Sequence, residues 1–372
     1  IPDAIENLTG TDWTNPDTDG GGMLDGDECP VAFWGTLCAN SPYDPFDPTD
    51  DIVENGVVFW ANNTTGNVDL SQVHRWRLNT NDFYTGSTYA SIAEVHPFSP
   101  LVPNADNLSQ LPDNSLSNGT VDWEITYKEL IGLGNVPVSS YYRNITFWSD
   151  PSTTLQRSND THNVNIDFGE ISRLNLRQEE YFFDWTTLAP NTVATQGYDY
   201  QLEVPDYFSD QQASEYQVTE TVNTIIQDAS SSDGYTVAQS ISDFLRLGND
   251  SQEFNLYHTP TSRLTGQDVT SYVLANGFGQ CTDYNAAFVT MARLAGLPAR
   301  YVTGYVGGEW NGVGYTVSTQ HYTSWGEVKL SFNAGSGPVD LGWVPFDSCP
   351  PAENLTILNQ TITQLTLDRD LV

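Results

Sequence analysis

The chain is predicted to be an α+β protein, because strand-like and helix-like patterns occupy different parts of it. Residues 52–205 contain segments in which apolar and polar side chains alternate, separated by clusters of Asn, Asp, Ser, Pro and Gly. Residues 214–248 repeat apolar side chains at helical spacing. Four regions follow from these patterns: an acidic loop module (1–51), a β-sandwich-like domain (52–205), a core of helices packed on an antiparallel sheet (206–352) and a C-terminal β-strand extension (353–372).

The segment 277–304 predicts a helix followed by a strand. Cys281 opens the helix, and Gly296 with Pro298 ends it. Its apolar face is built from Tyr284, Phe288, Met291 and Ala295. A cysteine at a helix N-terminus lies against unpaired N–H groups, which favour the thiolate. Cys281 is therefore a candidate nucleophile, and a buried structural cysteine or half of a disulfide is the alternative.

Two later segments favour the nucleophile. Residues 318–330 predict a strand that carries His321, and residues 342–347 predict a strand that ends at Asp347. Cysteine, histidine and aspartate follow in the order used by transglutaminase-like and papain-like thiol enzymes. With the Gly-x-Cys helix, Leu-Pro-Ala-Arg-Tyr-Val-Thr-Gly-Tyr and Gly-Trp-Val-Pro-Phe-Asp, residues 214–352 closely resemble the transglutaminase-like superfamily.

The resemblance implies a thiol hydrolase or acyltransferase acting on peptide or protein amides. Cys281 would attack the carbonyl carbon, His321 would carry the proton to the leaving amine, and Asp347 would orient the imidazole. Hydrolysis is favoured over crosslinking, because Lys128 and Lys329 are the only lysines that the chain offers as acceptors.

One departure from the family pattern affects this function. The family places its histidine two residues before a Trp and four before a Glu, and Thr323 stands there relative to Trp325 and Glu327. In the favoured interpretation, a bulge or register shift brings His321 to Cys281. In the alternative, Thr323 occupies the catalytic place and the core is an inactive scaffold in a surface or filament-forming structural protein.

Two further expectations concern the remaining cysteines. Cys29 and Cys38 lie nine residues apart in a loop-rich stretch and are predicted to form a disulfide. Cys349 is expected to be free, and a bond to Cys281 in an oxidised resting state is the less favoured alternative.

The acidic module contains a candidate structural Ca²⁺ site. Residues 17–28 follow the twelve-position pattern of oxygen ligands with Gly22 at the sharp turn, and they resemble the calcium loops of thrombospondin type 3 repeats. Gly21 departs from that pattern by removing one ligand. The candidate ligands are Asp17, Asp19, Met23 through its carbonyl, Asp25 and Glu28, with Asn15, Asp27, Asp44 and Asp47 as further contributors. The alternative is a solvated acidic loop.

The composition predicts a secreted or cell-surface protein. A net charge of -35 excludes nucleic acid and anionic membrane as partners, and it fits a saline environment or a secreted acidic protein. No apolar run approaches the ~20 residues that span a bilayer, and the N-terminal Ile1 indicates a processed or trimmed chain. The density of sequons favours glycosylation, with candidates at Asn7, Asn62, Asn63, Asn107, Asn118, Asn144, Asn159, Asn249, Asn354 and Asn359.

Two partner surfaces remain as hypotheses. The nearly uncharged segment 355–367 is expected to pair within the chain, and self-association through this strand is the alternative. A glycan-binding face within residues 52–205 is a third, less favoured function.

Overall fold

The computed structural model describes residues 56–65, 73–85, 89–90, 98–102, 107–108, 116–127, 135–149, 154–158, 163–168, 174–195, 201–249, 253–256, 267–335 and 337–350. The chain divides into two compact units, Ile1–Gly56 and Val57–Val372. The predicted calcium loop, the Cys29–Cys38 disulfide and the C-terminal strand lie outside the described residues.

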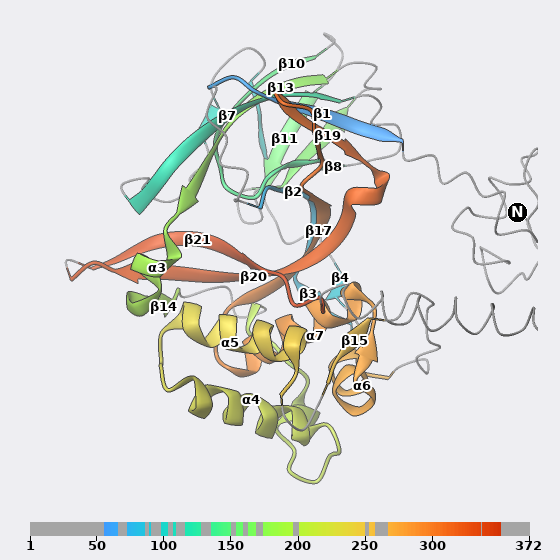
Figure 1. Ribbon diagram of the computed structural model, residues 1–372, viewed down its shortest axis with the longest axis vertical. Coiled ribbons are helices and arrows are strands. Elements are labelled where there is room, and N and C mark those ends of the chain that lie inside the picture. Colours follow the sequence, from blue (N-terminus) through green and yellow to red (C-terminus); the bar gives the residue numbers. More distant parts are fainter. Residues whose placement is uncertain are drawn as a thin grey trace, which may run out of the picture. The chain divides into compact units, whose positions relative to one another are not determined.

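A β-sandwich forms one part of the second unit (Figure 1). Its larger sheet has the order β18-β19-β1-β7-β13-β10-β6, and its smaller sheet has the order β5-β11-β12-β8. Both sheets contribute to one apolar core that includes Trp123, Phe147 and Leu155. The strands are β1 (Val57–Asn63), β5 (Phe98–Pro100), β6 (Asn107–Leu108), β7 (Ser117–Tyr127), β8 (Asn135–Val136), β10 (Tyr142–Ser149), β11 (Thr154–Ser158), β12 (Val164–Phe168), β13 (Leu174–Phe183), β18 (Glu309–Trp310) and β19 (Gly314–Ser318).

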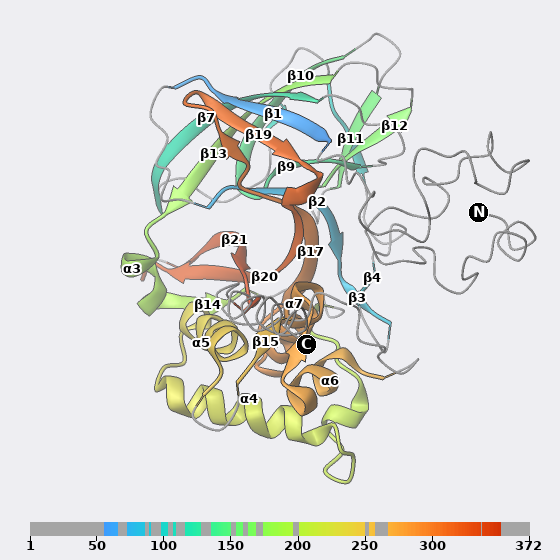
Figure 2. The same cartoon turned by 45° about the vertical axis from the view of Figure 1, so that its right-hand side comes forward.

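A second layered region packs helices on a further antiparallel sheet, as predicted (Figures 1 and 2). That sheet has the order β14-β20-β17-β2-β9, with β21 paired to β20. Its strands are β2 (Arg75–Asn81), β9 (Val138–Ser139), β14 (Thr192–Ala194), β17 (Ala299–Val306), β20 (Tyr322–Asn333) and β21 (Pro338–Phe346). Short elements complete the region: β3 (Phe83–Tyr84), β4 (Tyr89–Ala90), α3 (Trp185–Leu188), β15 (Asn255–Leu256) and β16 (Phe278–Gly279).

Four helices cover this sheet: α4 (Tyr216–Ala229), α5 (Gly234–Leu247), α6 (Val269–Asn276) and α7 (Cys281–Leu294). The apolar stripes predicted for 214–248 are confirmed, since Val218 and Val222 on α4 and Ile241 and Leu245 on α5 are buried. Helix α7 is buried on all sides from residue 284 to residue 293. It packs on β20 and β17 and also on α4, α5 and α6, and these contacts fix the position of the helix.

The two halves of the sequence share their sheets. Strand β1 pairs with β19, and β2 pairs with β17, so segments from residues 57–81 lie beside segments from residues 299–318. We predicted separate domains at 52–205 and 206–352. A division of the chain at residue 205 would separate β1 from β19 in the larger sheet of the sandwich and β2 from β17 in the sheet under the helices.

No helix in the part of the chain that the structure describes is both long enough and apolar enough to span a membrane.

Candidate functional site

The backbone before Cys281 is fixed by two helix ends. Gly277 ends α6 with φ 71°, a left-handed conformation that glycine adopts without steric cost. Gln280 is the N-cap of α7, and the Asp283 carboxylate accepts a hydrogen bond from the Gln280 backbone N–H at 3.1 Å. Cys281 is consequently the first residue of a well-capped helix, as predicted.

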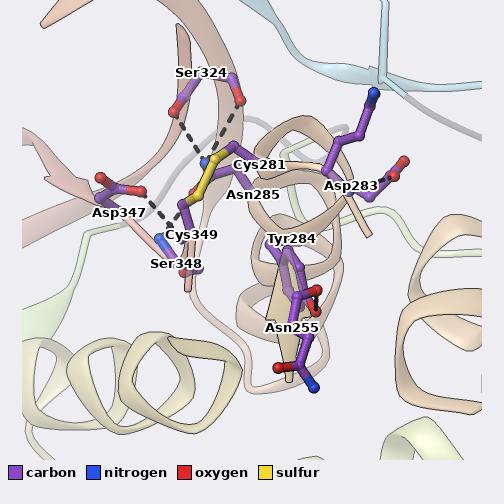
Figure 3. Close-up of a disulfide and its surroundings, with 10 residues drawn as sticks. Asn255, Cys281, Asp283, Tyr284, Asn285, Ser324, Asp347, Ser348 and Cys349 are labelled. Atoms are coloured by element: carbon purple, nitrogen blue, oxygen red, sulfur yellow. Dashed lines mark hydrogen bonds between the residues drawn. A yellow bond between two sulfur atoms is a disulfide. The ribbon is translucent and has the colours of Figure 1, made fainter. Parts of the chain in front are cut away.

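Cys281 is joined to Cys349 by a disulfide, with the two Cα atoms 4.7 Å apart (Figure 3). That spacing lies within the usual range for a disulfide. The expectation that Cys349 is free is therefore wrong. The sequence brings it to Cys281 because β21 pairs with β20 beside α7, which carries the chain after Phe346 past the N-terminus of that helix.

The side chain of Asn285 ties together the three elements around the disulfide (Figure 3). Its Nδ2 donates to the Ser324 carbonyl on β20 at 2.9 Å, and its Oδ1 accepts from the Ser348 backbone N–H at 2.9 Å. Asn285 is completely buried and lies one turn after Cys281. It fixes Ser348 directly beside Cys349. Sequence analysis missed this residue, although an Asn placed three residues before Phe288, on the predicted apolar face, was the available signal.

His321 does not lie on the predicted strand. Residues Thr319–His321 form a 3-10 turn, and β20 begins only at Tyr322. The prediction that this strand extends back to carry His321 is therefore wrong. The pairing of β20 with β17 runs without a shift from Tyr322 to Val328. It contains no bulge of the kind that the favoured interpretation required.

The imidazole of His321 is engaged within its own turn. Its Nδ1 accepts a hydrogen bond from the Ser318 backbone N–H at 3.1 Å and lies 3.0 Å from the Ser318 hydroxyl. An accepting Nδ1 assigns the proton of the neutral ring to Nε2. The ring therefore caps the turn that precedes β20.

A cavity of about 300 Å³ adjoins the disulfide. Cys281 lies in its wall, and β20 contributes Tyr322, Thr323 and Ser324. Leu256, Gln280, Thr282 and Thr303 complete the wall. The polar groups among these side chains are hydroxyls and an amide, and Cys281 contributes its disulfide sulfur. None of them carries an imidazole or a carboxylate, and His321 is not part of this wall.

Asp347 follows β21 directly, as predicted, and its carboxylate has other partners than His321. Its Oδ1 accepts the backbone N–H of Cys349 at 3.1 Å. Burial lowers the pKa of the Arg75 guanidinium, and the charge of Asp347 is the largest influence that raises it again. Among the described residues, Asp347 makes no hydrogen bond to His321. The three residues predicted as a triad are thus present, but only Cys281 and Asp347 lie at the disulfide.

Two residues of the family-like motifs, Arg300 and Glu327, form a buried ionic cluster with Arg77. The Glu327 carboxylate accepts from Arg77 at 2.9 Å and from Arg300 at 2.7 Å, and all three residues are fully or almost fully buried. Trp325 donates to the same carboxylate at 3.1 Å, and the Arg300 guanidinium stacks 4.1 Å from the centre of the Trp343 ring. These motif residues hold the sheet together, a role that their spacing in the sequence did not indicate.

Electrostatics in this cluster follow from burial and pairing. Burial raises the pKa of the Glu327 carboxyl, but Arg77 and Arg300 outweigh that effect and hold the pKa below its ordinary value. Burial lowers the pKa of Arg300 to about 10, against the opposing pull of Glu327. The cluster therefore depends on all three charges being present together.

Two other observations concern the described residues away from the disulfide. Among the described residues, no group of three or more His, Cys, Asp or Glu side chains is placed to hold a metal ion. A larger cavity, of about 860 Å³, lies between α4, α5 and α6, and its walls contain neither Cys281 nor Asp347.

The segment that contains this site is similar to known proteins in sequence and in fold. Residues 220–348 match the model of the transglutaminase-like superfamily. By this match the segment is similar to a transglutaminase-like domain. The matched segment includes Cys281, Thr323, Asp347 and most of the layered region of helices and sheet.

Relatives of the transglutaminase-like domain extend the comparison. Over 85 residues the chain is 33% identical to the uncharacterized protein YebA of Bacillus subtilis (strain 168), an alignment that spans 21% of this chain and 10% of that protein. The crystal structure of the periplasmic domain of TgpA from Pseudomonas aeruginosa is similar, with 15% identity and a TM-score of 0.51 over 80% of this chain and 88% of that chain. Its ethylmercury-bound form gives 14% identity and a TM-score of 0.50, over 79% and 89%. At these identities the two structures show a shared fold.

Proposed function

We propose that the chain is a non-catalytic, disulfide-closed scaffold built on a transglutaminase-like domain. The observation that carries this proposal is the state of the predicted nucleophile. The sulfur of Cys281 is bonded to Cys349, and the strand beside it contributes no base to the adjoining cavity.

Acyl transfer by a cysteine requires a free thiolate and a group that protonates the leaving amine. A disulfide sulfur cannot attack a carbonyl carbon. Reduction would free the thiol, but the imidazole of His321 would still be held by Ser318. The loss of general acid–base assistance alone costs roughly 10²–10⁴-fold in rate.

We further propose an extracellular or cell-surface location with protein partners. Disulfides persist in oxidising compartments. The net charge of -35 and the density of sequons agree with a hydrated outer surface. In this proposal Ca²⁺ bound by residues 17–28 and a Cys29–Cys38 disulfide shape the acidic module, which has too few apolar residues for a core of its own.

The alternative is a thiol hydrolase or acyltransferase whose Cys281–Cys349 bond is a resting state. One observation favours it: Cys281 begins a buried helix and lines a cavity, with Asp347 at the same disulfide.

The variant Cys349→Ser distinguishes the two functions because it frees Cys281 permanently. We expect no release of amine from peptide amides by this variant, above the level of a Cys281→Ser/Cys349→Ser control. The measurement is amine release from denatured casein and from short amide substrates at pH 7, with circular dichroism to confirm folding. Amide turnover that requires Cys281 and falls about 100-fold or more in His321→Ala would overturn the proposal and establish the enzyme.

A second prediction concerns the thiol itself. In the Cys349→Ser background, the pH profile of Cys281 alkylation by iodoacetamide is expected to stay unchanged on His321→Ala, because the imidazole lies outside the cavity wall. Mass spectrometry locates the label. An imidazole-paired thiol would instead react far below pH ~8.5, the range of an unperturbed cysteine, and would lose that reactivity in the variant.

A further inference from the structure

The Cys281–Cys349 bond differs in its surroundings from a disulfide buried in a core. Cys281 and Cys349 are both only partly buried. Cys281 lies in the wall of the 300 Å³ cavity, which is at the small end of the range for ligand pockets. Only a small molecule fits such a volume, so access to the bond from this side is limited by size.

The two cysteines are held in place by contacts that do not involve sulfur. Asn285 fixes the Ser348 backbone N–H, and Asp347 accepts from the Cys349 backbone N–H at 3.1 Å. The Ser348 hydroxyl donates to Ser242 on α5 at 3.1 Å. Cleavage of the sulfur–sulfur bond would leave this network intact, so both thiols would stay close enough to form the bond again.

The position of Cys281 also suits it to leave as a thiolate. It is the first residue of a 14-residue helix, where backbone N–H groups and the helix dipole stabilise negative charge on sulfur. The wall of the cavity beside it contains no carboxylate and no imidazole, so the helix N-terminus is the polar feature at this sulfur.

From these features we infer that the chain carries out thiol–disulfide exchange with low-molecular-mass thiols, through a redox-active Cys281–Cys349 pair in the folded protein. The thiolate of the small molecule attacks the Cys281 sulfur, a mixed disulfide forms, and Cys349 leaves as a thiolate that takes up a proton. A second small thiolate then attacks the outer sulfur of the mixed disulfide, which releases a small disulfide and the Cys281 thiolate. Two thiols are oxidised to one disulfide while the protein disulfide is reduced to two thiols, and the reverse sequence regenerates the protein bond.

The accessibility of the two sulfur atoms from the cavity determines which of them a small thiol attacks. The better leaving group is the sulfur at the helix N-terminus, which on its own would direct attack to Cys349. Only Cys281 belongs to the wall of the cavity, so the geometry directs a small thiol to Cys281 instead. The location of the first mixed disulfide therefore tests the inference directly.

The experiment uses the full chain with glutathione as the probe. The wild-type protein is mixed with reduced glutathione, quenched with acid at intervals, alkylated and mapped by mass spectrometry. We expect glutathione on Cys281 in preference to Cys349 by about tenfold or more. We also expect reduction without loss of the near-UV circular dichroism signal, at a rate that low concentrations of urea do not change.

Two results would overturn the inference. One is reduction that tracks the population of unfolded protein and rises steeply with urea, because the bond would then be a purely structural one. The other is a mixed disulfide found equally on both cysteines. The variants Cys281→Ser and Cys349→Ser, incubated with oxidised glutathione, give a second readout: Cys281 is expected to be modified about tenfold faster than Cys349. Neither readout depends on amide turnover, so the result of this experiment is independent of the test of the proposed scaffold.

Discussion

Replacement of Glu327 by Gln is expected to lower the free energy of unfolding by about 3–5 kcal/mol. The carboxylate is completely buried and bonds two buried guanidinium groups, those of Arg77 and Arg300. A neutral amide of the same size would leave two positive charges in the interior without a counter-ion, and its NH₂ group would face further donors. The loss of the anion therefore costs far more than the loss of one hydrogen bond.

Urea unfolding at pH 7, followed by tryptophan fluorescence, measures this effect. Glu124→Gln is the matched control, because Glu124 pairs with Arg177 at 3.2 Å on the surface, with the two side chains 46% and 53% exposed. An exposed pair contributes about 0–1 kcal/mol. Equal losses in the two variants would show that the buried cluster does not stabilise the sheet.

The stability difference between the wild type and Glu327→Gln should also depend on pH in a defined direction. The folded pKa of Glu327 lies below its ordinary value of 4.5, so the unfolded chain binds the proton more readily. The contribution is complete above that ordinary value and is lost as the pH falls through the folded pKa. The difference is therefore expected to be constant from pH 6 to pH 8 and to shrink below pH 4.5. A difference that grew on acidification would contradict this assignment.

Replacement of Gly304 by Ala is expected to have the second large effect. A Cβ atom at this position would lie 2.1 Å from the Trp76 carbonyl oxygen and 2.9 Å from the Leu78 backbone nitrogen. Both atoms belong to β2, the neighbouring strand, so relief requires the β2–β17 pair to separate. We expect a loss of about 2–3 kcal/mol or more, near the upper end for overpacking in a core.

Gly119→Ala provides the control for glycine substitution in a strand, because a Cβ atom there meets nothing within 4 Å. The midpoint of urea unfolding should move strongly for Gly304→Ala and little for Gly119→Ala. If both variants unfolded at the wild-type midpoint, β2 would have to move away from β17 without cost, against the pairing described here.

Local patterns in the sequence predicted the helices and the strand that surround Cys281. The apolar spacing on α7 and the Gly–Pro signal after it depend on neighbouring residues only, and the structure confirms both. Cys281 and Cys349 are 68 residues apart in the sequence. Their disulfide therefore depends on how β20 and β21 return the chain to the helix. No local pattern carries that information.

His321 illustrates a different limit. Residues 318–330 contain apolar and β-branched side chains that favour a strand, but the side chain of Ser318 and the imidazole together stabilise a turn at its start. The assignment of His321 as the catalytic base stays a prediction. The place that the family pattern reserves for histidine is occupied by Thr323, in the wall of the cavity.

The sharing of strands between the two halves of the sequence sets the order in which the molecule can fold. During synthesis from the N-terminus, β1 and β2 emerge long before their neighbours β19 and β17, which both lie between residues 299 and 318. Their open edges must wait for more than half of the chain, and contacts of such large sequence separation slow folding and leave edges exposed to other chains. A ribosome-bound fragment that stops before residue 299 would contain the neighbours β7 and β9 but would lack the second partner of each strand. Protection from hydrogen exchange of the backbone amides that β1 and β2 direct toward β19 and β17 should therefore appear late, together with that of β17 and β19.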